Sequence, residues 1–217
     1  MVVVVMISIV ALLAAPSFTE ARNDRIAFDY ARQYQQVLVQ ARSRAAGTGS
    51  AHLVLMTPGT GGRGVIRAYA ALDGTTGGGP NPVASCRANP TQWATAEPEI
   101  TDYRTDRVLG GNWVRFINFA ELNRAGVNET MDLRATLTVG DGDVGSPSAP
   151  TTHLAVCITP SGITYVGSGG GAGAAVAAMR GAPPFTGIAE ARIVRGTGGL
   201  RRLVTISGGG APRLRSE

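Results

Sequence analysis

The sequence predicts an α+β fold in which one N-terminal helix packs on an antiparallel β-sheet domain. Residues 1–15 are apolar on every side, apolar residues recur at helical spacing through residues 17–46, and short β-patterned segments separated by glycine-rich turns follow from residue 47 onward. The composition agrees, because 30 glycines and only 16% charged residues favour a loop-rich β domain over a helical bundle. We therefore expect two units, a helix over residues 1–46 and a globular β-rich domain over residues 47–217.

The predicted helix changes character at Pro16. Residues 1–15 carry no charge, which favours a membrane-embedded half, whereas residues 17–46 are polar with one apolar stripe, which favours an amphipathic half. The stripe consists of Phe18, Ile26, Tyr30, Tyr34, Leu38, Ala41 and Ala45. Fifteen residues reach only about 22 Å, less than the roughly 30 Å hydrocarbon core of a bilayer. A signal peptide requires basic residues before its apolar run, and none precedes this one. Because the run is also too short to span a bilayer, we expect that residues are missing before Met1.

Eight segments with β patterning follow the helix, and their short glycine- and proline-rich connections favour antiparallel pairing. They are His52–Thr57, Val65–Leu72, Asn112–Phe119, Leu133–Val139, His153–Ile158, Ile163–Val166, Ile188–Val194 and Leu200–Ser207. The low-complexity run Gly167–Ala178 is predicted to be a flexible loop with a short helix at its end, and Gly208–Glu217 to be a tail. Residues 73–132 give no indication of function.

The chain shows no catalytic constellation. All 20 basic residues are arginines, which excludes a Walker A lysine and a Schiff-base lysine, and no G-x-S-x-G nucleophile motif occurs. Gly167–Ala172 partly mimics a dinucleotide-binding fingerprint, but too little chain follows it for the required βαβ units. His52 and His153 fall within predicted strands, and Asp141 and Asp143 within a turn cluster. We therefore expect no catalytic residue, no metal and no cofactor, and the chain is not predicted to be an enzyme.

The N-terminal run MVVVVMISIVALLAAPSF, from Met1 to Phe18, resembles the N-terminal helix of type IV pilins and type II secretion pseudopilins. In those proteins an apolar helix is interrupted by a proline and followed by an aromatic residue, which match Pro16 and Phe18. Family members also carry a basic leader, a first phenylalanine and a glutamate two residues before the position of Met1, and these are absent here. The resemblance assigns to the membrane and filament helix Val2, Val3, Val4, Val5, Ile7, Ile9, Val10, Leu12, Leu13, Pro16 and Phe18.

The C-terminal third narrows the resemblance. The segment Cys157–Gly162, followed by a variable loop and by Arg201–Ser207 with a glycine- and arginine-rich ending, looks like the minor pseudopilin H family and related minor pilins. The similarity covers residues 1–57 and 153–215. The same similarity is found in subunits of secretion, pilus and DNA-uptake machines. It does not identify a secreted cargo or a position in a filament.

The resemblance implies a pilin-like fold and a structural role. Such a subunit is a minor pseudopilin of a type II secretion system or type IV pilus-like filament, taking part in protein secretion across the outer membrane. It would be clipped and methylated by a prepilin peptidase if a leader exists upstream. It would then sit in the inner membrane as a single-pass protein with its globular domain in the periplasm. Its partners in the filament would be other pseudopilins or pilins, contacted through the N-terminal helix.

The two cysteines, Cys86 and Cys157, fall in the part that this resemblance places in the periplasm. Because that compartment oxidises thiols, we expect a disulfide between them. Two inert buried thiols are the alternative, and a structural zinc site is disfavoured because no C-x-x-C or H-x-x-x-H spacing occurs.

Arginines crowd the end of the chain, and Arg201, Arg202, Arg213 and Arg215 are candidate contacts for DNA or another anionic partner. Some pilus-type relatives end in a Gly-Arg-x-Arg motif associated with DNA binding, which Pro212–Arg215 resembles with proline in place of glycine. A DNA-binding minor pilin for DNA uptake is therefore the alternative function. The plainer interpretation is a solvated strand face and tail.

Overall fold

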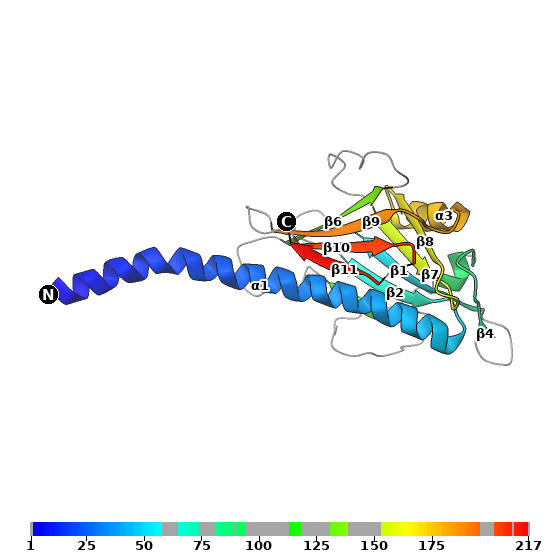
Figure 1. Ribbon diagram of the computed structural model, residues 1–217, viewed down its shortest axis with the longest axis horizontal. Helices are drawn as coiled ribbons and strands as arrows, with labels where there is room; N and C mark the ends of the chain where they lie inside the picture. Colours follow the sequence, from blue (N-terminus) through cyan, green and yellow to red (C-terminus); the bar gives the residue numbers. More distant parts are fainter. Residues whose placement is uncertain are drawn as a thin grey trace.

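The protein combines helices with antiparallel β-sheets, as Figure 1 shows. The computed structural model describes residues 2–57, 65–73, 81–88, 90–93, 113–118, 131–138, 153–195, 202–209 and 211–216. Within them, every strand pairing is antiparallel. The predicted α+β class with antiparallel sheets is therefore confirmed. The predicted turn with Asp141 and Asp143 lies outside the described residues, as does Arg201.

Helix α1 spans Val2–Thr48 and ends two residues beyond the predicted boundary. Its side chains are described continuously over residues 27–48. In this part the buried positions follow the 3.6-residue period, so one face packs on the sheets while the other faces solvent. These positions are Ala27, Ala31, Tyr34, Val37, Leu38, Ala41 and Ala45. The helix ends at Thr48, and Gly49 directly after it adopts a left-handed conformation with a φ of 70°.

The N-terminal half of α1 points away from the sheets in Figure 1. It contains Pro16, which removes one backbone donor from the helix. No helix in the described part of the chain is long and apolar enough to cross a membrane.

The central layer is a five-stranded sheet with the order β5-β2-β1-β7-β8. Its strands are β5 (Trp113–Asn118), β2 (Val65–Ala70), β1 (His52–Thr57), β7 (His153–Ile158) and β8 (Thr164–Gly169). The second sheet has four strands in the order β11-β10-β9-β6. They are β11 (Arg213–Ser216), β10 (Arg202–Ser207), β9 (Ile188–Arg195) and β6 (Met131–Thr138). The remaining elements are the short pair β3 (Leu72–Asp73) and β4 (Asn81–Pro82), the single turn α2 (Pro90–Trp93), and α3 (Ala172–Gly181).

The two inner strands β1 and β7 are buried on both faces of the central sheet, and the pleat assigns alternate residues of β1 to two different cores. Val54 and Met56 point to a core shared with α1 and the second sheet, which we call the helix-side core. Leu53 and Leu55 point to a core shared with α3 and α2, which we call the disulfide-side core. Besides these two residues, the disulfide-side core contains Ala51, Ala71, Cys86, Ala88, Trp93, Ala155, Cys157, Ala175 and Met179. Burial on both faces explains why β1 and β7 are nearly continuous apolar runs.

The flexible loop predicted at the start of Gly167–Ala178 is wrong, whereas the short helix predicted at its end is confirmed. The glycines at 167 and 169 belong to β8, and α3 begins at Ala172. A Cβ atom on Gly167 would lie 2.1 Å from the backbone nitrogen of Met179, so the missing side chain is what lets α3 lie directly on β8. Low complexity here reflects close backbone packing, and Ala175 and Met179 are fully buried against the sheet.

Candidate functional site

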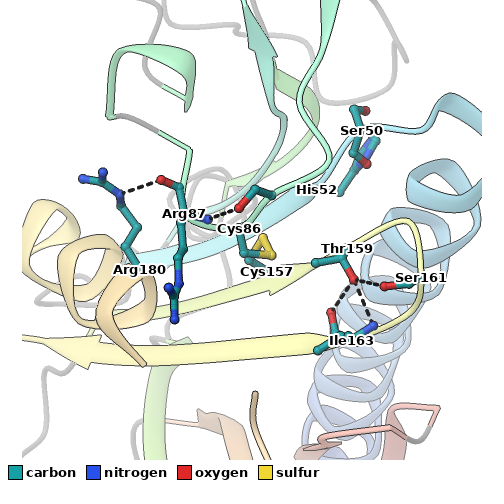
Figure 2. Close-up of a disulfide and its surroundings, with 10 residues drawn as sticks. Ser50, His52, Cys86, Arg87, Cys157, Thr159, Ser161, Ile163 and Arg180 are labelled. Atoms are coloured by element: carbon teal, nitrogen blue, oxygen red, sulfur yellow. Dashed lines mark hydrogen bonds between the residues drawn. A yellow bond between two sulfur atoms is a disulfide. The ribbon is translucent and has the colours of Figure 1, made fainter. Parts of the chain in front are cut away.

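A disulfide joins Cys86 to Cys157, as predicted, with a Cα–Cα distance of 5.8 Å. Both residues are buried in the disulfide-side core. Cys157 lies on β7, next to the centre of the sheet, and Cys86 lies in the segment between β4 and α2 (Figure 2). The bond therefore fixes a short irregular segment to the most buried part of the fold.

Backbone hydrogen bonds hold the same segment from its other end. The amide of Val83 donates to the carbonyl of Ala71 at 2.9 Å, and the amide of Ala51 donates to the carbonyl of Val83 at 2.7 Å. Arg180 on α3 donates through Nε to the carbonyl of Arg87 at 3.4 Å, as Figure 2 shows. These contacts and the disulfide together fix the segment that precedes Trp93, and the Trp93 side chain is 3% exposed.

An open pocket of about 300 Å³ lies beside this segment. Leu53 and Leu55 of β1 and Tyr69 of β2 line it from the sheet, and Trp93 and α3 line its other sides. Two positively charged residues, Arg67 on β2 and Arg180 on α3, also line it. Apart from the alternation on β1, no local pattern indicates this pocket, because its walls come from β1 and α3, which are more than 100 residues apart in the chain.

The predicted tail is not a tail, because β11 forms the edge strand of the second sheet and pairs with β10. Gln35 on α1 donates through Nε2 to the carbonyl of Pro212 at 2.8 Å, and Arg42 donates to the carbonyl of Gly209 at 3.0 Å. Leu214 packs against the helix-side core. These contacts leave Arg213 and Arg215 exposed together on the opposite face of the strand.

Arg202 does not enlarge this arginine pair, contrary to our expectation. Its guanidinium lies 5.5 Å from the ring centre of Phe28 on α1, a cation–π contact on the helix side of the sheet. Because alternate residues of a strand face opposite sides, Leu203 rather than Arg202 shares the face of Arg215. On that face β9 contributes Arg192, which is opposite Leu203 and lies 3.6 Å from Glu190. Arg192, and not Arg202, is therefore the arginine that lies on the same face of the second sheet as Arg213 and Arg215.

All of the residues predicted to form the membrane and filament helix lie within α1. The structure describes only their backbone, as part of α1, and not their side chains. Among the described residues, no group of three or more His, Cys, Asp and Glu side chains could hold a metal ion.

His52 is buried at the start of β1, and its Nδ1 lies 3.2 Å from the carbonyl oxygen of Ser50. Burial lowers the pKa of His52, the Ser50 carbonyl opposes this shift, and Arg44 adds to it. The folded state therefore favours the neutral imidazole. Its contribution to stability is present above the unfolded pKa of about 6.5 and is lost as the pH falls through the lower folded pKa.

We expect wild type to lose more stability than the His52→Gln variant when the pH falls from about 7.5 to about 5. The reason is that acidification must place a charge on a buried ring in wild type only. Urea unfolding at both pH values measures the difference in the free energy of unfolding between the two proteins. Parallel pH profiles for wild type and His52→Gln would contradict the expectation.

Comparison with known proteins adds no relative. No family model matches the chain, and neither a curated protein nor a solved structure is detectably similar to it.

Proposed function

We propose that this protein is a structural subunit of a type II secretion or type IV pilus-like filament, with the role of a minor pseudopilin. One observation carries the proposal: the uncharged residues 2–15 belong to the same helix whose later residues, from Ala27 to Ala45, pack on antiparallel sheets. An apolar segment that projects from a folded domain on a helix offers surface for packing against equivalent helices. In such a filament the globular domain lies on the outside, and the apolar helices pack inside.

The physical role of the projecting segment follows from its composition. Val2, Val4, Ile9 and Leu13 are large apolar residues with no charge among them or their neighbours up to Ala15. Each such side chain gains about 1.5–3 kcal/mol when it moves from water to an apolar environment. Neighbouring pilins or pseudopilins provide that environment in a filament, and the inner membrane provides it before assembly. In this proposal a prepilin peptidase processes any upstream leader, and the domain lies in the periplasm.

A gene deletion tests the proposal and separates its alternatives. We expect loss of protein secretion across the outer membrane, restored by the wild-type gene, if the subunit serves a secretion filament. Loss of DNA uptake with intact secretion would instead assign it to an uptake pilus. Unchanged secretion, pilus number and DNA uptake would refute the filament proposal.

Val4→Asp should abolish complementation in that strain, whereas Val4→Leu should retain it. A carboxylate placed in an apolar helix contact or at the bilayer centre costs roughly 2.5–3.5 kcal/mol on insertion scales, and leucine costs nothing comparable. Immunoblots of membrane and sheared-filament fractions measure where each variant accumulates. Equal filament incorporation of the aspartate and leucine variants would contradict the assigned role of residues 1–15.

A second candidate function, a minor pilin that captures DNA, is favoured by the exposed pair Arg213 and Arg215 on one face of β11. Each phosphate contact contributes roughly 0.9 to the slope of log affinity against log salt concentration. The Arg213→Ala/Arg215→Ala variant should therefore lower that slope by about two. Arg202→Ala is the matched control, since Arg202 lies on the opposite face. Gel-shift titrations at several salt concentrations give the slopes, and absence of DNA binding by wild type at low salt would remove this candidate.

A further inference from the structure

The outer face of the second sheet, which is turned away from the helix-side core, carries more charge than the arginine pair of β11. Strand register places its residues in two rows across β11, β10 and β9. The first row is Arg215, Leu203 and Arg192, and the second is Arg213, Thr205 and Glu190. Neighbouring strands lie about 4.8 Å apart, and two residues of one strand rise about 6.8 Å. The Cα atoms of the four charged residues therefore mark the corners of an area of roughly 7 by 10 Å.

Three of these four charged residues are arginines. Arg213 and Arg215 are exposed, and within the described part of the chain neither is paired with an acidic side chain. Arg192 has a partner, because its Nη2 atom lies 3.6 Å from Oε2 of Glu190. Three positive charges and one negative charge leave a net charge of +2 on these four residues. The face therefore attracts anions even with the Arg192–Glu190 pair in place.

The ion pair between Arg192 and Glu190 is weak enough to be exchanged for another anion. At 3.6 Å the contact is longer than a hydrogen bond, and ion pairs near the surface contribute little to stability. The two side chains are 17% and 20% exposed, so both reach solvent. Arg192 Nε has no hydrogen-bond partner in the described part of the structure. A phosphate that replaces the Glu190 carboxylate would add charge-assisted hydrogen bonds to Arg192 at the cost of this one contact.

The outer face suits a charged backbone better than a protein partner. Leu203, at its centre, is 6% exposed and offers little apolar surface. Ile188 is 50% exposed, but it lies at the start of β9, beyond Glu190. The energetic centre of a protein interface is usually a well-packed apolar anchor among the charged residues. DNA needs only positive charges near its phosphates, which follow one another about every 3.4 Å along one strand.

We propose that the phosphate backbone of double-stranded DNA lies across this outer face and that Arg192 contacts a phosphate in addition to Arg213 and Arg215. Glu190 releases Arg192 when DNA binds, so Glu190 lowers the affinity of the protein for DNA. Contacts to phosphates carry no sequence information, and the binding is therefore independent of sequence. The inference rests on the second candidate function, the capture of DNA, and adds to it a third contact and an opposing carboxylate.

Fluorescence anisotropy with the full-length chain and a fluorescein-labelled duplex tests the inference. Titrations between about 20 and 200 mM salt give the slope of log affinity against log salt concentration. Arg192→Ala should lower that slope by about 0.9, which is the value for one phosphate contact. Glu190→Gln should raise affinity about threefold, because DNA no longer displaces a carboxylate from Arg192. In the Arg192→Ala background the Glu190→Gln change should have a smaller effect, since the two residues act on each other.

The controls separate local contacts from general charge. Asp29→Asn removes one negative charge from the exposed side of α1 and should raise affinity less than Glu190→Gln. Ile188→Ser removes the exposed apolar residue of β9 and should leave affinity unchanged. Polyglutamate of the same total charge, and phosphatidylglycerol vesicles of the same phosphate concentration, should compete less well than unlabelled duplex. Thermal melting of each variant verifies that the fold is retained.

The outcomes distinguish this inference from the proposals around it. An unchanged salt slope for Arg192→Ala, with a lower slope for Arg213→Ala/Arg215→Ala, would overturn the inference and leave DNA capture standing. Equal effects of Glu190→Gln and Asp29→Asn would overturn the role of Glu190. Loss of binding by Ile188→Ser, or equal competition by polyglutamate or vesicles, would identify a face for acidic proteins or lipids instead. Absence of DNA binding by wild type at low salt would remove both the inference and the DNA-capture candidate, whereas the filament proposal depends on the deletion strain alone.

Discussion

Reduction of the Cys86–Cys157 disulfide is expected to lower the free energy of unfolding by about 4 kcal/mol. The two residues are 71 positions apart, and in the chain-entropy model the cross-link restricts the unfolded chain in proportion to the logarithm of the loop length. Reduction also removes the covalent attachment of the segment before Trp93 to β7, and both cysteines are buried in the folded protein. Urea unfolding with and without reductant measures the loss.

The double variant Cys86→Ala/Cys157→Ala is the control for this prediction. Alanine places no polar group in the disulfide-side core, so the variant reports the loss of the cross-link rather than a buried hydroxyl. Its stability should be similar to that of the reduced protein and should not respond to reductant. Wild-type protein that carries two alkylatable thiols, or that unfolds at the same urea concentration with and without reductant, would contradict the prediction.

Among glycine-to-alanine substitutions in β8 and α3, Gly167→Ala is expected to lower the free energy of unfolding most. The added Cβ would lie 2.1 Å from the Met179 backbone nitrogen, 2.6 Å from the Ala175 carbonyl oxygen and 2.6 Å from the Met179 Cα atom. All three are backbone atoms, so no side-chain rotation relieves the clash, and α3 must move away from β8. Overpacking of this kind costs about 1–3 kcal/mol or more.

Gly173→Ala provides the matched comparison, because a Cβ atom at Gly173 meets nothing within 4 Å. Gly173 lies inside α3, where alanine is favoured over glycine by roughly 0.5–1 kcal/mol, so this variant should be slightly more stable than wild type. Thermal unfolding of the two variants measures effects of opposite sign. Equal stability of Gly167→Ala and wild type would show that α3 does not pack on β8 as described.

Local pattern was sufficient to find most of the elements. The boundaries of β1 and β7 coincide with the predicted segments, because strands buried on both faces are short apolar runs bounded by turn residues. The amphipathic period after Pro16 identified the face of α1 that is buried from Ala27 to Ala45. The disulfide pairing was the one possible combination once two cysteines in an oxidising compartment were assumed.

Tertiary structure decided the rest, since it depends on contacts between residues far apart in the chain. Glycine-rich sequence is typical of loops, yet at Gly167 and Gly169 the absent side chains permit close contact between α3 and β8. The register of β11 on β10 turned a predicted tail into an edge strand, and the pleat then placed Arg202 on the opposite face from Arg213 and Arg215. The sequence by itself determined the class of fold and its main elements. Strand order and register, which bring Arg67 and Arg180 to one pocket, were determined by long-range pairing that no local period encodes.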